Sequence, residues 1–143
     1  MEGKVKVHGE LVSFSTPGEL WSTDLTHEVE KIVKNSGITE GIVVVSVIGS
    51  TGAVGTIEFE SGLQKDIATL MEELIPSKRH WRHNDTWGDA NGHSHLRATL
   101  LGPSVTIPVS KGKPVLGTWQ QIFFIEFDIR PRNRKVFVQV MGI

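Results

Sequence analysis

Histidines are concentrated in one segment of this chain. Four of its six histidines lie in the sequence HWRHNDTWGDANGHSHL, among acidic and amide side chains: His80, His83, His93 and His95. Neutral imidazole is the commonest protein ligand for transition metals. The spacing of His83, His93 and His95 is compatible with a three-nitrogen metal site that leaves one position open for water or a substrate oxygen. The alternative interpretation is a polar surface loop whose histidines face solvent.

Whether His93 and His95 can share one ligand depends on the secondary structure of residues 93–101. The leucines of this segment suit a helix, whereas its alternation of polar and apolar residues suits a strand. On a strand the two imidazoles would lie on the same side, but on a helix they would diverge by about 200°. The sequence pattern leaves both possibilities open.

The same segment could also act without a metal. His83 or His95 could serve as a general acid or base, because imidazole titrates near neutral pH. Asp85 and Asp89 lie near enough in the sequence to orient the imidazole rings. His80 is the weakest candidate of the four histidines.

A second group of candidate residues lies in the C-terminal third of the chain. Within residues 117–130, an apolar face alternates with a polar face that carries Glu126, Asp128 and Arg130. This polar face is either the solvated side of an antiparallel strand or part of a site. Trp119 could belong to the core, or it could form one wall of a pocket for a flat heterocycle.

Three arginines follow at alternate positions. If the chain is extended there, Arg130, Arg132 and Arg134 point in one direction, and planar guanidinium groups suit phosphate or carboxylate ligands. Pro131 and Asn133 favour instead a charged hairpin tip. A further loop, residues 49–52, has the small residues Gly-Ser-Thr-Gly and could present backbone amides to an anion.

Hydrophobic periodicity predicts the elements that must position these residues. Strands are expected at 4–14, 41–48, 53–59, 105–109 and 117–130, with a last strand through Val136, Val138 and Val140. Helices are expected at 22–36 and 62–75. The predominance of strands, together with two separate helices, predicts an α+β fold. We expect a mostly antiparallel sheet or sandwich with two to three helices. Residues 1–143 are expected to form a single compact domain.

The composition excludes several classes of protein. A net charge of −1 provides no general attraction for nucleic acid or for an anionic membrane. The absence of cysteine excludes disulfides and thiolate chemistry. The N-terminal sequence has no signal-peptide pattern and no apolar run is long enough to span a bilayer, so we expect a cytoplasmic protein without membrane or nucleic-acid partners.

Several sequence blocks together resemble the YjbQ family, whose members are also called secondary thiamine-phosphate synthases. The blocks are Asn91-Gly92-His93-Ser94-His95-Leu96, Leu101-Gly102-Pro103-Ser104, Leu116-Gly117-Thr118-Trp119-Gln120-Gln121-Ile122 and the arginines before the last strand. The resemblance covers most of the chain. It implies a compact α+β domain that assembles as a homotrimer. It also implies a weak activity that joins hydroxymethylpyrimidine diphosphate to thiazole phosphate and releases diphosphate.

The resemblance also assigns expected roles to matching positions. The residues expected to take part in catalysis are His83, His95, Glu126 and Arg134. Those expected to bind a small phosphorylated metabolite are Thr51, Ser104, Thr118, Trp119, Gln120 and Arg132. Those expected to hold a divalent metal, zinc or magnesium, are His83, His93 and His95. Many members carry a histidine where this chain has Ser50, so His93 would complete the metal ligands here.

Two other functions remain open from the sequence. The same histidines could support metal-dependent hydrolysis of a phosphoester. Alternatively, the domain could bind a small phosphorylated metabolite without turning it over, because a shared fold does not fix a function.

Overall fold

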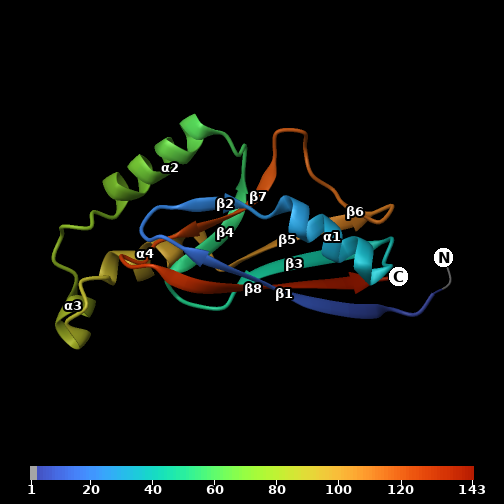
Figure 1. Cartoon of the computed structure of the whole chain (residues 1–143), viewed down its shortest axis with the longest axis horizontal. Coiled ribbons are helices and arrows are strands. Elements are labelled where there is room, and N and C mark those ends of the chain that lie inside the picture. The colour runs from blue at the N-terminus through green and yellow to red at the C-terminus, as the bar shows by residue number, and fades with distance from the viewer. Residues whose placement is uncertain (1–2) are drawn as a thin grey trace.

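Two antiparallel β-sheets and four helices make up residues 3–143, the part of the chain that the computed structural model describes (Figure 1). The larger sheet has the strand order β1-β8-β3-β5-β6. Its members are β1 (Lys6–Thr16), β8 (Arg132–Gly142), β3 (Gly41–Val47), β5 (Ser104–Ser110) and β6 (Lys113–Pro114). The smaller sheet has the order β2-β7-β4, with β2 (Ser22–Asp24), β7 (Gln121–Glu126) and β4 (Gly52–Ile57). The predicted α+β class and the antiparallel pairing are confirmed.

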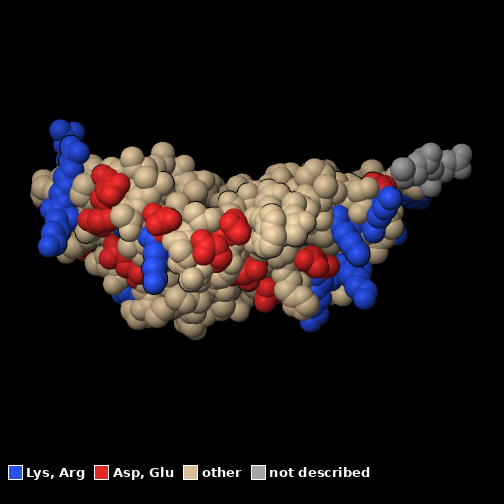
Figure 2. Space-filling view, turned by 90° about the horizontal axis from the view of Figure 1, so that it is seen from above, with Lys and Arg blue, Asp and Glu red and all other residues tan. Residues whose placement is uncertain are grey.

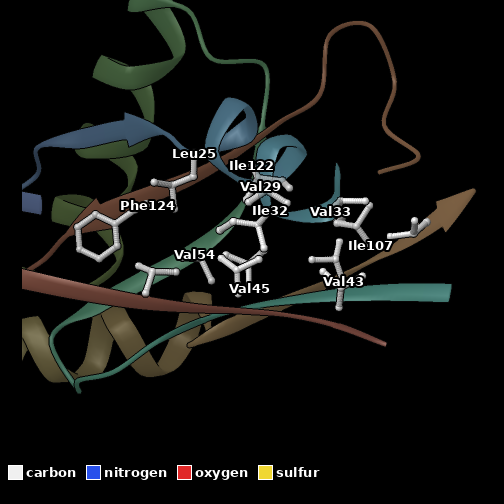
Figure 3. Close-up of a cluster of buried hydrophobic side chains, with 14 of the residues drawn as sticks. Leu25, Val29, Ile32, Val33, Val43, Val45, Val54, Ile107, Ile122 and Phe124 are labelled. Carbon is white, nitrogen blue, oxygen red and sulfur yellow. The ribbon is translucent and has the colours of Figure 1, made fainter. Parts of the chain in front are cut away.

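The helices are α1 (Thr26–Ser36), α2 (Ser61–Leu74), α3 (Arg82–Trp87) and α4 (Gly92–Leu101). The main hydrophobic core lies between α1 and the two sheets, where Val29 and Val33 of α1 meet Val43 and Val45 of β3 (Figure 3). A second core lies beneath α2 and α4, against the other face of the smaller sheet, and contains Phe123, Ile125, Phe127, Met71 and Ala98. The smaller sheet is therefore covered on both faces.

The first helix is shorter than its sequence pattern suggests. We predicted a helix from residue 22, but residues 22–24 form β2 and pair with β7. The Leu25 amide donates to the Ile122 carbonyl at 2.7 Å, and the Thr26 amide donates to Asp24 Oδ1 at 2.9 Å. The helix begins only where these bonds to the sheet end.

The strand predicted at 117–130 is confined to β7, residues Gln121–Glu126. As the middle strand of the smaller sheet it is covered on both faces, so Ile122, Phe123, Phe124 and Ile125 are all buried. A strand buried on both faces has a continuous apolar sequence instead of an alternating one. Of the two alternatives for the polar face, the solvated side is therefore wrong for Glu126 and Asp128, which are buried, whereas Arg130 lies beyond the strand and is exposed.

Residues 93–101 form a helix, α4, which decides the alternative that the sequence left open. The short helix α3 precedes it and has no apolar periodicity long enough to be predicted. Both helices lie together at one end of the molecule (Figure 1). Within the described residues, no helix is both long and apolar enough to cross a membrane.

Candidate functional site

A buried ion pair lies where β7 ends and β8 begins. Glu126 is 0 % exposed and Arg134 is 3 % exposed. Glu126 Oε1 accepts hydrogen bonds from Arg134 Nε at 2.8 Å and from Thr16 Oγ1 at 2.7 Å. Glu126 Oε2 accepts from the Asp128 amide at 3.0 Å and from an Arg134 terminal nitrogen. All these bonds are needed, because a charge taken out of water is costly unless it is paired and hydrogen-bonded.

The loop before β4 surrounds the guanidinium of Arg134. Arg134 donates to Thr51 Oγ1 at 2.8 Å. A Cβ atom at Gly49 would lie 2.9 Å from an Arg134 nitrogen, and one at Gly52 would lie 2.7 Å from the Phe124 ring. The small residues of this loop therefore make room for an arginine of the same chain, and we find no need to assign them to an external anion.

Asp128 extends the polar network from this ion pair. Thr51 Oγ1 lies 3.2 Å from Asp128 Oδ2, and Arg132 forms an ion pair with the same carboxylate at 3.2 Å. Burial acts to raise the pKa of Asp128. Hydrogen bonds from the Ile129 amide and Asn91, with Arg132 nearby, outweigh that effect and hold the pKa below its ordinary value. Asp128 is therefore ionised at neutral pH.

Asn91 connects this network to the histidine-rich segment. Its amide nitrogen lies 3.3 Å from Asp128 Oδ1. With the amide turned over, the nitrogen would instead donate to Asp89 Oδ1 at 3.2 Å. The first orientation keeps the hydrogen bond to Asp128, and the second exchanges it for hydrogen bonds to Asp89. In either orientation, the Asn91 side chain lies between the two carboxylates.

Helices α3 and α4 bring two of the predicted histidines together. The rings of His83 in α3 and His95 in α4 have centroids 4.4 Å apart and planes inclined at 45°. The Gly92 amide donates to Asn84 Oδ1 at 2.9 Å, which attaches the start of α4 to α3. A Cβ atom at Gly92 would lie 2.7 Å from the Cβ of Trp81. Only glycine allows this approach, so the position of the histidine pair depends on it.

The third histidine of the predicted metal site lies elsewhere. His93 is 2 % exposed, and its Nε2 lies 2.5 Å from Glu19 Oε1. One helical turn later, Arg97 is fully buried and forms ion pairs with Glu19 and with Glu72 of α2. The ion pairs on this side of α4 therefore connect the helix to α2 and to the segment before β2.

The three-histidine metal set is therefore not formed within one chain. On the helix, His93 and His95 point in different directions, as the helical alternative requires. Among residues 3–143, no group of three or more His, Asp and Glu side chains is placed to hold a metal ion. The residues of one chain thus do not fit a resident three-ligand zinc site.

His83 and His95 open onto a hollow of about 700 Å³. Its remaining walls come from the chain around α3 and from the first turns of α4: Arg79, His80, Trp81, Arg82, Gly92 and Leu96. Figure 2 shows Lys and Arg side chains, with Asp and Glu side chains beside them, at the end of the molecule where Figure 1 places α3. The hollow is thus a basic, partly aromatic space next to the histidine pair.

The remaining predicted residues lie away from this hollow. Thr118, Trp119 and Gln120 precede β7, whereas Glu126 ends it, so the length of the strand, roughly 20 Å at about 3.3 Å per residue, separates them. Trp119 is 74 % exposed on a loop that stands clear of α3 and α4 (Figure 1). Ser104 is exposed at the start of β5, beyond the far end of α4.

Sequence reasoning missed Thr16 and Asn91 as members of the polar network. Thr16 ends β1 and is buried against Glu126, and Asn91 precedes α4. The available signal was the pair of carboxylates in the apolar run FFIEFDI, which indicates buried charges that need partners. The partners themselves come from distant parts of the chain.

The pKa of His95 is lowered from its ordinary value of 6.5, first by burial and then by the neighbouring His83, while Asp128 and Asp89 oppose the shift. Since the folded-state pKa is depressed, protonation of His95 favours the unfolded chain. The contribution of His95 to the free energy of unfolding is therefore full above pH 6.5 and is lost as the pH falls through the folded-state value.

We predict that NMR titration of His95 gives a midpoint below 6.5. His83→Gln should raise that midpoint, because it removes a neighbouring positive charge while keeping most of the burial. Asp89→Asn should lower it further, because it removes an opposing negative charge. A midpoint that stays the same in His83→Gln would show that the two rings do not interact electrostatically.

We also predict that Glu126→Gln lowers the free energy of unfolding by about 3–5 kcal/mol, because it leaves the Arg134 guanidinium buried without a counter-charge. Chemical denaturation measures this loss. The control is Glu10→Gln, which makes the same substitution in the half-exposed His8–Glu10 pair and should cost far less. Equal losses in the two variants would contradict the central place given to Glu126.

Comparisons with known proteins find similarity over nearly the whole chain. The family described as UPF0047 protein YjbQ-like matches residues 10–143. A UPF0047 protein of Methanothermobacter thermautotrophicus is 41% identical over 138 residues, which cover 96% of this chain and 94% of that protein. One of Archaeoglobus fulgidus is 43% identical over 118 residues, covering 82% of this chain and 89% of that protein.

Solved structures agree with this result. A protein of unknown function from Sulfolobus solfataricus P2 has a TM-score of 0.92 and 39% identity, and the match covers 98% of this chain and all of the other. A hypothetical protein from Aeropyrum pernix K1 has a TM-score of 0.83 and 38% identity, covering 94% of this chain and 99% of that one. The sequence blocks that carried the resemblance thus lie in a shared fold, and the chain belongs to the YjbQ-like UPF0047 family.

Proposed function

We propose that this protein is an enzyme that acts on small phosphorylated metabolites at the His83–His95 pair. The reaction we favour is of the thiamine-phosphate synthase type, in which a thiazole nitrogen forms a bond to the methylene carbon of hydroxymethylpyrimidine diphosphate and diphosphate leaves. The observation that carries the proposal is the paired imidazoles of His83 and His95, 4.4 Å apart at the wall of a basic hollow.

His95 has the properties of a group that can donate a hydrogen bond or a proton to the departing diphosphate. Its lowered pKa keeps the imidazole neutral near pH 7, so that one ring nitrogen can donate a hydrogen bond while the other accepts one. Together with His83, it would stabilise the negative charge that develops on the departing diphosphate. Arg132, which is only half-buried beside Asp128, has further N–H groups to offer a phosphate oxygen.

Glu126 and Arg134 support the site from beneath in this proposal. Since both Glu126 oxygens already accept hydrogen bonds, the carboxylate is an orienting group in this proposal. Arg134 is likewise occupied by Glu126 and Thr51. The buried pair fixes the loop at Thr51 and Asp128, and through Asn91 it supports the start of α4.

The divalent cation expected from the sequence is proposed only as an ion that binds together with the substrate. Two imidazoles from one chain do not complete a three-nitrogen zinc site. Magnesium prefers oxygen ligands and usually binds with substrate phosphates, so it would enter together with the diphosphate. A chelator should then lower the rate at which the substrate complex reacts, because it removes the cation that binds with the diphosphate. It should not change the free protein.

A second function, binding without turnover, is favoured by one observation. The buried carboxylate of Glu126 is saturated by its own chain and cannot serve as a base toward a ligand. Metal-dependent phosphoester hydrolysis has less support, because no three-ligand group of one chain is in place among residues 3–143. Product analysis separates binding from turnover.

The test uses purified protein with hydroxymethylpyrimidine diphosphate and thiazole phosphate, and it follows the formation of thiamine phosphate and diphosphate. We expect His95→Gln to reduce turnover about 10²- to 10⁴-fold, the usual contribution of a proton-transfer group. The control, His27→Gln, changes an exposed histidine of α1 and should leave the rate unchanged. Equal turnover in the wild type and His95→Gln would refute the role of this site.

We also propose that the chain assembles as a homotrimer through the outer face of the larger sheet. Val7 and Leu11 of β1 pair with Met141 and Phe137 of β8 on this face, and all four are at least one-third exposed. A shallow hollow of about 270 Å³ continues the face over Ile42 and Val44 of β3. Large exposed apolar patches typically mark interfaces between proteins.

Sedimentation equilibrium should therefore give three times the chain mass for the wild type. We expect Val7→Glu combined with Met141→Glu to shift the protein toward the monomer, because two charges would be buried at the interface. Val115→Glu, an exposed apolar position on the loop before β7, is the control. A monomeric wild type would contradict the proposed assembly.

A further inference from the structure

The fixed charges in the lining of the hollow beside the histidine pair are those of two arginines, Arg79 and Arg82. Arg79, His80 and Arg82 line it together with His83 and His95, and its lining contains no Asp or Glu side chain. Concave surfaces lined by one sign of charge concentrate ligands of the opposite sign. The net charge of the whole chain is −1, so this basic character belongs to the hollow and is not a general property of the molecule.

The two arginines of the hollow differ from the arginines elsewhere in the candidate site. Arg97, Arg132 and Arg134 each form an ion pair with a carboxylate. Arg79 and Arg82 form no ion pair or hydrogen bond with any other side chain in residues 3–143. Among the residues that line the hollow, they are the guanidinium groups whose donors are free for a ligand.

Arg79 is also held in position. Its guanidinium carbon lies 4.6 Å from the centre of the Trp81 ring, and Trp81 Nε1 donates to the Pro76 carbonyl at 2.9 Å. The Trp81 ring is thereby fixed, and the guanidinium stacks on it. A stacked guanidinium keeps its N–H groups at its edges, where they can donate in pairs to a phosphate.

We infer that Arg79 and Arg82 bind the phosphate or diphosphate group of the ligand, with His83 and His95 at the bond where the group is attached. This inference rests on the proposed function and changes its assignment of phosphate binding. From the sequence we expected Arg132 and Arg134 to bind phosphate oxygens. Arg134, however, is buried and its guanidinium is hydrogen-bonded to Glu126. The hollow of about 700 Å³ exceeds the volume of a diphosphate, so it also has room for the organic part of the ligand.

Isothermal titration calorimetry with inorganic diphosphate at constant ionic strength tests the inference. Arg79→Gln and Arg82→Gln should each weaken binding about tenfold or more, the effect of losing hydrogen bonds to a charged group. The matched control is Lys78→Gln, which removes the same charge from the exposed neighbouring residue outside the hollow and should change affinity less than about threefold. Inorganic phosphate, which can span fewer donors, should bind more weakly than diphosphate.

The outcomes distinguish this inference from the proposed function. An equal loss of affinity in Lys78→Gln and Arg82→Gln would overturn it, since the binding would then reflect general surface charge. Diphosphate binding that is unaffected by both arginine substitutions would also overturn it, even if His95→Gln abolishes turnover. Weakened binding in the arginine variants would support the inference even if no thiamine phosphate is formed.

Discussion

The ion pair between Glu126 and Arg134 is the constraint on which the rest of the site depends. Both groups are almost completely removed from water, so every one of their hydrogen-bonding positions must be matched by the surrounding chain. The pair and its partners lie in four separate segments: the end of β1 at Thr16, the loop at Thr51, the end of β7 and the start of β8. One buried pair therefore fixes how these segments meet. A hydrophobic core of similar volume could be as stable, but it would not fix the relative positions of these loops through directional bonds.

The histidine pair depends on a second, steric constraint. Gly92 allows the start of α4 to lie directly against Trp81 and Asn84 of the preceding segment, and this contact brings His83 and His95 together. On the opposite side of α4, His93 and Arg97 connect the helix to α2 and to Glu19. The helix thus has one face for the hollow and another for its own attachment. His93 and His95, separated by one residue, therefore have different contacts: His93 contacts Glu19, and His95 faces His83.

The two constraints meet at Asp128 and Asn91. Asp128 contacts Thr51 and Arg132 on the side of the ion pair, and the Asn91 amide lies between Asp128 and Asp89 on the side of the histidines. The electrostatic effect of this arrangement reaches His95, where burial and His83 lower the pKa while Asp128 and Asp89 limit the shift. The buried network and the open hollow therefore form one electrostatic unit, although a single hydrogen-bond chain does not join them.

The sequence by itself determined the α+β class, most of the strands, the two long helices and the position of the histidine-rich segment. Local periodicity and turn residues encode these features, and they depend on neighbours in the chain. The tertiary structure decided what local patterns cannot encode. It turned the polar residues at the end of β7 inward, because β7 lies between two strands and is covered on both faces. It separated His93 from His95 by making residues 92–101 a helix. It also placed Trp119 and Glu126 at opposite ends of one strand, since residues close in sequence lie far apart when the chain between them is extended.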